Sequence, residues 1–289
     1  MVVWITSFGR SGNTFFRVVM HHLYGVNTYA AFNATEVLVT AGADQLVGHK
    51  ELPPALKAAM AAGRPEQIRL ALDELEASKE LFVFKTHAWA TELFETNYRA
   101  VLIVRDGRDA LASYANYLVD IRFDSAAYKQ RVRQMSQSRS GLFDRRAWIH
   151  LAKIATITSA KKVGLRHWLV SRRIDQLLRE RSDSHLDWST MNRSWLECEP
   201  KPVVVYFDDL VGDPIGTVTR AVDALDIGLV PRAEAAVPSF AKLKARYPNF
   251  FRKGTSGDWK EHLSPAQEAL FWAKHEAVMN ALNFCRIKG

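Results

Sequence analysis

Cysteine is scarce in this chain, since only two of its 289 residues are cysteines, Cys198 and Cys285. A disulfide framework needs more of them, and a zinc site needs cysteine or histidine ligands at short, regular spacings, which the sequence does not show. We therefore expect reduced thiols, a cytoplasmic location and no bound metal ion.

Long hydrophobic runs are also absent, because no stretch approaches the roughly 18 apolar residues that a membrane-spanning helix needs. The first residues carry neither a basic region nor a cleavage site, so we expect no secretory signal peptide. A hydrophobic content of 48% with 24% charged residues is typical of soluble globular proteins. These features predict a chain without a membrane span.

The lysine of a Walker A loop is missing too, although the start of the chain otherwise suits phosphate binding. The apolar run Val2–Ile5 reads as a buried strand, and the glycine-bearing turn SFGRSGNTFFR and a helical pattern follow it. Gly9 and Gly12 let the backbone approach an anion closely, and the helix N-terminus is electropositive. The turn also holds the donors Arg10, Ser11, Asn13 and Thr14. The pattern predicts a phosphate-binding turn, with an ordinary strand-to-helix connection as the alternative.

Strands alternate with helices, which is typical of a parallel sheet with helices on both faces. The expected strands are Val2–Ile5, Leu81–Phe84, Ala100–Val104 and Pro202–Tyr206, with a loop over Gly25–Thr35. The expected helices are Asn13–Leu23, Pro53–Ala62, Pro65–Lys79, Asp109–Leu118, 124–137, 144–162, 164–181, Val211–Leu225 and Pro265–Leu282. We predict one three-layer, P-loop-like α/β domain, 1–289, in which about 120–200 form a helical insertion or cap.

Polar side chains gather just after the predicted strands. They are Arg10, Lys85, His87, Arg105 and Tyr206. Ligands bind at the carboxyl ends of the strands in open α/β sheets, so we expect these side chains to share one site.

Four segments, in chain order, resemble the sulfotransferases that use 3′-phosphoadenosine 5′-phosphosulfate, PAPS. They are SFGRSGNTFFR at 7–17, FKTH at 84–87, VRDGRDALASY at 104–114 and FRKGTSGDWKEHL at 251–263. The opening is similar to that of soluble bacterial members that act on small molecules. The chain departs from the family at Gly9-Arg10, where Pro-Lys is usual, and at Phe15, where Trp is usual. The resemblance does not cover Asn116 to Glu199.

The resemblance implies transfer of the sulfuryl group of PAPS to an acceptor hydroxyl or amine, with release of adenosine 3′,5′-bisphosphate, PAP. Residues implied at the 5′-phosphate are Arg10, Ser11, Gly12, Asn13 and Thr14. Residues implied at the 3′-phosphate are Arg105, Ser113, Arg252, Lys253 and Gly254, and Tyr206 is implied at the adenine. Pairing of Arg105 with Asp106 or Asp109 and a core role for Tyr206 are the alternatives.

His87 is the expected general base, because FKTH matches the motif that carries the family's catalytic histidine. An imidazole with an ordinary pKa of about 6.5 can accept the proton of an attacking hydroxyl. Lys85 and Arg10 would stabilise charge on the departing phosphate oxygen, so no metal is needed. His262 is the weaker alternative base.

Positive charge is concentrated in the middle of the chain. The segment from Ser125 to Arg181 holds 14 Lys and Arg and three acidic residues, so its net charge is about +11. Because the whole chain has a net charge of +8, the remaining residues together carry about −3. Solvated helix faces, an anionic small-molecule or carbohydrate acceptor and an anionic membrane surface all fit this charge. Nucleic acid fits least, because few aromatic residues could stack on bases.

Several questions stay open from the sequence. The segment WSTMNRSWL at 188–196 either lines the acceptor pocket or packs the core. A P-loop kinase-like phosphotransferase and a non-catalytic basic binding protein are the rival functions. The identity of the acceptor and the oligomeric state are not determined.

Overall fold

The computed structural model describes residues 1–32, 42–90, 99–122, 152, 155, 157–159, 161–184, 186–248 and 250–284. All four segments that resemble the sulfotransferases lie within this part of the chain. The predicted helix 124–137 and most of the predicted helix 144–162 lie outside the described residues.

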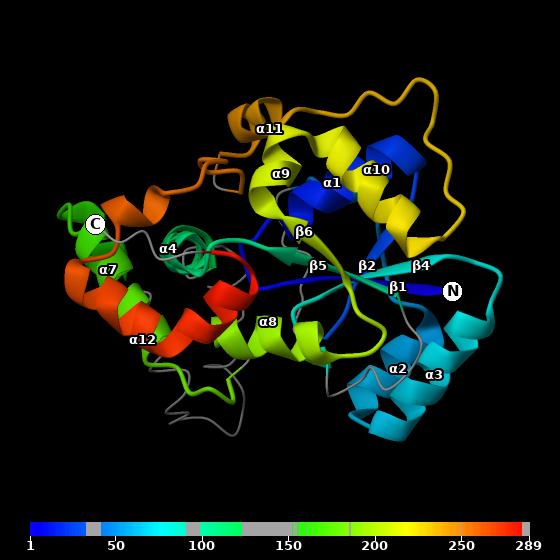
Figure 1. Ribbon diagram of the computed structural model, residues 1–289, viewed down its shortest axis with the longest axis horizontal. Coiled ribbons are helices and arrows are strands. Elements are labelled where there is room, and N and C mark those ends of the chain that lie inside the picture. The colour runs from blue at the N-terminus through cyan, green and yellow to red at the C-terminus, as the bar shows by residue number, and fades with distance from the viewer. Residues whose placement is uncertain are drawn as a thin grey trace.

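A six-stranded parallel sheet forms the centre of the described part (Figure 1). Its strands are β1 Val2–Ser7, β2 Thr28–Ala30, β3 His49–Lys50, β4 Phe82–Thr86, β5 Arg99–Val104 and β6 Val203–Tyr206. Their spatial order is β3-β2-β4-β1-β5-β6. The chain leaves β1 toward one side and β5 toward the other, so the topological switch point lies between the carboxyl ends of these two strands.

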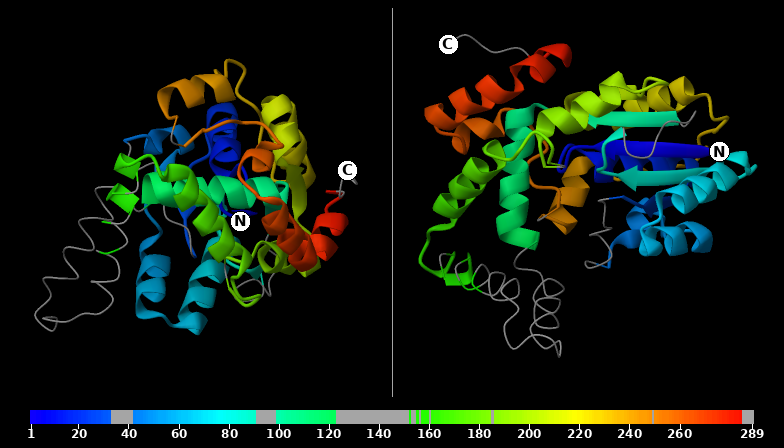
Figure 2. Two further views of the ribbon diagram at one scale, coloured as in Figure 1. Left: turned by 90° about the vertical axis from the view of Figure 1, so that its left-hand side faces the viewer. Right: turned by 90° about the horizontal axis from the view of Figure 1, so that it is seen from below.

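Helices cover both faces of the sheet, as predicted, and a further group lies beyond the carboxyl ends of the strands (Figures 1 and 2). On one face lie α1 Asn13–Tyr24, α9 Phe207–Gly212, α10 Pro214–Leu225 and α11 Phe240–Arg246. On the other lie α2 Pro54–Ala62, α3 Pro65–Ala77 and α8 Trp188–Glu197. Beyond the strand ends lie α4 Gly107–Tyr117, α7 Arg166–Leu178 and α12 Pro265–Ala281.

Strand β1 is buried on both sides of the sheet. Val2 and Trp4 belong to the core on one face, and Val3 and Ile5 belong to the core on the other. A strand covered on both faces needs an unbroken apolar run, which is why the sequence predicted this strand well.

The short strands β2 and β3 were not predicted, because the sequence indicated a loop over 25–35. Both are too short to show a period of two residues. Thr28 is buried, its hydroxyl accepts from Arg17 Nη2 at 2.6 Å, and it donates to the Val47 carbonyl at 2.7 Å. These partners are distant in the chain, so tertiary contacts hold this edge of the sheet in place.

The predicted helix 211–225 is two helices in the structure. Asp213 separates them, because its side chain accepts from the Gly216 N–H at 3.0 Å and caps the start of α10. Pro214 is then the first residue of α10, where its missing N–H costs nothing.

The two tryptophans of α8 pack into the core. Trp188 and Trp195 are each 1% exposed, and Trp195 Nε1 donates to the Ala88 carbonyl at 2.9 Å. This burial supports the packing interpretation of the segment over a role as a pocket wall. Within the described residues, no helix combines the length and the hydrophobicity that crossing a membrane requires.

His275 on α12 provides a pH-dependent contribution to stability. It is 1% exposed, its Nδ1 lies 2.7 Å from Ser189 Oγ, and burial lowers its pKa below the ordinary value of 6.5. As the pH falls below about 6.5, His275 therefore becomes protonated in the unfolded chain but stays neutral in the folded chain. The free energy of unfolding should decrease there by up to about 1.4 kcal/mol per pH unit.

Urea unfolding at several pH values between 7 and 5 measures this effect. The variant His275→Asn should be less stable at pH 7 but should show a flatter dependence on pH. An unchanged slope in the variant would contradict the assignment to His275.

Candidate active site

The turn between β1 and α1 has the backbone shape of an anion site. Arg10 and Gly12 have positive φ angles of 70° and 108°. A Cβ atom on Gly12 would lie 2.8 Å from the Phe207 ring, so only glycine fits there. Asn13 Nδ2 donates to the Ile5 carbonyl at 3.0 Å, which ties the start of α1 to β1.

Arg10 and Arg105 lie together above this turn. Arg10 Nη2 donates to the Phe250 carbonyl, and its guanidinium lies 5.4 Å from the centre of the Tyr117 ring. Arg105 donates to the carbonyls of Arg10 at 3.3 Å and Thr255 at 3.0 Å. Burial, together with the like charges of Arg105 and Arg252, lowers the pKa of Arg10 to about 10. The two side chains are therefore held close despite their repulsion.

The loop 252–259 closes over the arginines and is anchored to α4. Asp109 is fully buried and accepts from the backbone N–H groups of Gly257 at 2.7 Å and Trp259 at 2.9 Å. Burial raises the pKa of Asp109, while Arg105 and the two backbone donors act against that rise. Gly254 has a φ of 70°, and a Cβ atom there would lie 2.4 Å from Phe240.

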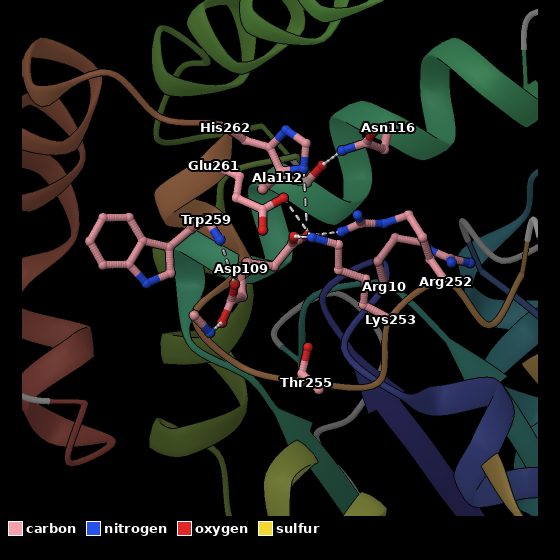
Figure 3. Close-up of polar contacts among 12 residues, drawn as sticks. Arg10, Asp109, Ala112, Asn116, Arg252, Lys253, Thr255, Trp259, Glu261 and His262 are labelled. Atoms are coloured by element: carbon pink, nitrogen blue, oxygen red, sulfur yellow. Dashed lines mark hydrogen bonds and ion pairs between the residues drawn. The ribbon is translucent and has the colours of Figure 1, made fainter. Parts of the chain in front are cut away.

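Arg252 and Lys253 lie in this loop and share a buried carboxylate, that of Asp258. Arg252 Nη2 donates to Asp258 Oδ2, and Lys253 Nζ lies 2.5 Å from Asp258 Oδ1. Lys253 also contacts Glu261 Oε2 at 2.6 Å. Figure 3 shows Arg10, Arg252 and Lys253 beside the segment that carries Trp259, Glu261 and His262.

Several donors at the centre of the site have no hydrogen-bond partner among the described residues. These buried atoms are the Nε atoms of Arg10, Arg105 and Arg252, and Oγ of Ser11. A buried polar atom without a partner is costly, and like charges crowded together repel. An anion with several oxygens would satisfy these donors and neutralise the repulsion.

His87 lies directly after β4, beside the same turn. Its Nδ1 is 2.6 Å from the Ser7 carbonyl oxygen, and its backbone N–H donates to the Phe32 carbonyl at 3.3 Å. Because a carbonyl can only accept, the neutral ring carries its proton on Nδ1 and its lone pair on Nε2. Lys85 lies within β4 and is 5% exposed.

Tyr206, Ser113 and Thr14 lie on β6, α4 and α1. Tyr206 ends β6, is partly buried and packs edge-on against Phe284, with ring centres 5.8 Å apart. Ser113 lies on α4 and is 5% exposed. Thr14 lies partly buried in the first turn of α1.

Comparison with known proteins decides which family this site belongs to. The family model described as the sulfotransferase domain matches residues 2–282. The chain belongs to the sulfotransferase family. No curated protein matches it.

The sulfotransferase fold is also found among solved structures. Mouse sulfotransferase SULT7A1 complexed with PAP matches with a TM-score of 0.53 and 14% identity, over 99% of this chain and 89% of that chain. Retinol dehydratase in a complex with retinol and PAP gives 0.47 and 16% identity, over 96% and 81%. At 14% identity, the likeness to SULT7A1 concerns the fold alone.

The sulfotransferase structure brings most of the predicted site residues to one edge of the sheet. Arg10, Arg105, Arg252 and Lys253 form one cation cluster, with Ser11 and Gly12 in the adjoining turn. Asp106 pairs with Arg108 at 2.6 Å, while Arg105 donates to the backbone carbonyls of Arg10 and Thr255. Asp109 stays an electrostatic neighbour of Arg105.

Two residues that shape the site of this sulfotransferase, Asp109 and Phe207, were not assigned a role in it from the sequence. Asp109 anchors the closing loop, and the Phe207 ring lies 4.3 Å below the Arg105 guanidinium. Asp109 stands inside a recognised motif, four residues after Arg105, and that position was its only signal. Phe207 carries no signal, since a phenylalanine after a strand usually belongs to the core.

One group among the described residues of the sulfotransferase could offer metal ligands: Asp258, Glu261 and His262. Both carboxylates already pair with Lys253, and Asp258 also pairs with Arg252. The side chains of Arg252 and Lys253 thus occupy the position that a metal ion would take. His262 lies 3.6 Å from Asp258 and stacks against His167.

Proposed function

We propose that this sulfotransferase uses PAPS and transfers its sulfuryl group to an acceptor hydroxyl or amine of a small molecule or sugar, releasing PAP. The observation that carries the proposal is the cluster of Arg10, Arg105 and Arg252, whose buried Nε atoms have no partner among the described residues. PAPS is anionic at both ends of an adenosine and would supply the missing acceptors. The PAP complex of mouse sulfotransferase SULT7A1, which shares the fold, supports this ligand.

Two clamps would hold the nucleotide. The turn at the N-terminus of α1, with Arg10, Ser11, Gly12, Asn13 and Thr14, would bind the 5′-phosphate through backbone N–H groups and side chains. Because Asn13 Nδ2 already donates to the Ile5 carbonyl, Asn13 would contact the 5′-phosphate through its backbone N–H. The second clamp, for the 3′-phosphate, would be Arg105, Ser113, Arg252, Lys253 and Gly254. Tyr206 would border the adenine.

His87 would act as the general base. The acceptor oxygen attacks sulfur and forms the new S–O bond, and Nε2 of His87 takes the proton that this oxygen loses. The bond between sulfur and the phosphate oxygen breaks, and its electron pair stays on that oxygen in PAP. The hydrogen bond from Nδ1 to Ser7 would keep Nε2 as the accepting nitrogen.

Lys85 and Arg10 would stabilise the charge that develops on the departing oxygen. Arg10 is held by Phe250 and Tyr117 on the turn, and Lys85 is buried in β4, so both cations are fixed before the ligand arrives. Fixed charges need no reorganisation during the reaction. The proposed reaction therefore needs no metal. A cytoplasmic location of this one-domain protein is part of the proposal, because the chain has only two cysteines.

Thermal unfolding in the presence of PAP tests the proposal. A ligand at about 100 times its Kd stabilises the folded state by roughly 2.7 kcal/mol, which raises Tm by several degrees in a chain of this size. We expect this shift with PAP and a smaller one with ADP. A shift with ATP and magnesium and none with PAP would overturn the proposal and favour a phosphotransferase.

A further inference from the structure

We propose that Asp258 is a positioning residue, whose carboxylate holds Arg252 and Lys253 in the orientation that receives the 3′-phosphate. The inference rests on the proposed function, because it concerns the second phosphate clamp. It predicts that removing a negative charge from this strongly positive site weakens the binding of an anion.

The contacts around Asp258 place it behind the two cations. Its side chain has no exposed surface, whereas those of Arg252 and Lys253 are 23% and 34% exposed. Asp258 therefore meets these cations on their buried side, and their accessible side is the one that a ligand can approach. Arg252 Nε is buried without a partner, so one donor of its guanidinium is not used by the carboxylate.

Residues other than Asp258 hold the backbone of the loop. Asp109 fixes the backbone at Gly257 and Trp259 from α4. The Trp259 ring is covered by Arg108, whose guanidinium lies 4.0 Å from the ring centre. Because other residues hold the backbone, the contacts of Asp258 act mainly on the side chains of Arg252 and Lys253.

Repulsion within the cluster explains why such a residue is needed. Arg252 lies near Arg10 and Arg105, and its charge lowers the pKa of both. Arg105 likewise lowers the pKa of Arg10. Without a counter-ion behind it, Arg252 would turn away from the other two toward solvent. Burial opposes ionisation of Asp258, but the neighbouring His262, Arg252 and Lys253 hold its pKa well below the ordinary value, so it stays charged.

The opposite role would be that of an internal competitor, in which Asp258 occupies the cations and the phosphate must displace it. The two roles differ in the sign of one effect. If Asp258 is a competitor, loss of its charge makes the phosphate bind more tightly. If it is a positioning residue, loss of its charge disorders Arg252 and Lys253, and the phosphate binds more weakly. The fully buried side chain of Asp258 favours the positioning role.

The variant Asp258→Asn tests this sign by calorimetric titration of PAP and of ADP, which lacks the 3′-phosphate. We expect Kd for PAP to rise at least tenfold and Kd for ADP to stay within about twofold. With PAPS and an accepted alcohol, KM for PAPS should rise while kcat at saturation changes little. Tighter or unchanged PAP binding, or equal weakening of both ligands, would overturn the inference.

Glu261→Gln is the matched control. It removes the same charge from the same short helical turn, Asp258–Glu261, but Glu261 is 68% exposed. Of the two cations, Glu261 contacts only Lys253. We expect its PAP affinity to be unchanged or slightly higher. A tenfold loss in this control would mean that charge in the loop, and not the position of Asp258, governs binding, which overturns the inference.

Two further outcomes are separated by the design. If Asp258→Asn does not fold, Asp258→Glu replaces it, since it keeps the charge and displaces the carboxylate by one methylene; the same selective loss of PAP affinity is expected, and normal affinity would overturn the inference. If the unaltered chain does not bind PAP, the proposed function itself fails. PAP binding by the unaltered chain with tighter binding by Asp258→Asn contradicts only the positioning role.

Discussion

Replacing His87 with alanine is expected to reduce sulfuryl transfer about a hundred- to ten-thousand-fold, the range that general acid–base catalysis contributes. The acceptor hydroxyl then has no group to take its proton at the moment of attack. PAP binding should stay within a few-fold, because no phosphate contact is assigned to the imidazole. Turnover with PAPS, followed by mass spectrometry of the sulfated acceptor, and calorimetric titration of PAP measure the two effects separately.

His262→Ala is the control for His87→Ala, since His262 is the other histidine considered as a base. It stacks on His167 and lies beside Asp258, so its loss should leave kcat within a few-fold. Equal losses of turnover and PAP affinity in His87→Ala would indicate that the ring only supports the turn through Ser7. Greater loss of kcat in His262→Ala would move the base to His262.

Replacing Arg105 or Arg252 with alanine is expected to weaken PAP binding about ten- to a hundredfold, since a hydrogen bond to a charged group contributes roughly 1.5–3 kcal/mol. ADP, which lacks the 3′-phosphate, should bind to both variants within about threefold of the unaltered chain. Titration of each variant with both ligands gives the comparison. The selectivity follows because both arginines are assigned to the 3′-phosphate clamp.

Arg220→Ala is the matched control for these two arginines. It removes one positive charge, but Arg220 lies on α10 with its side chain 66% exposed and pairs with Asp213. Its affinity for both ligands should not change. If the binding of PAP and of ADP weakens alike in Arg105→Ala and Arg252→Ala, the assignment of these arginines to the 3′-phosphate is wrong.

The fold was predictable where single segments carry strong patterns. β1, β4, β5 and β6 contain apolar runs, and the sequence predicted each strand to within two residues at either end. β2 and β3 are held by the buried contacts of Thr28 with Arg17 and Val47, which no local pattern reports. The break between α9 and α10 depends on the capping side chain of Asp213.

The sequence by itself determined the residues of the turn, the strand-end positions and the family, because these depend on local spacing and on long motifs. The tertiary structure alone decided which partners those residues have. Arg105 and Thr255 are 150 residues apart, as are Asp109 and Trp259, and only the closing of the loop over α4 brings them together. Burial then makes the partners matter, since charges that water would screen at the surface must here be balanced by neighbours such as Asp258.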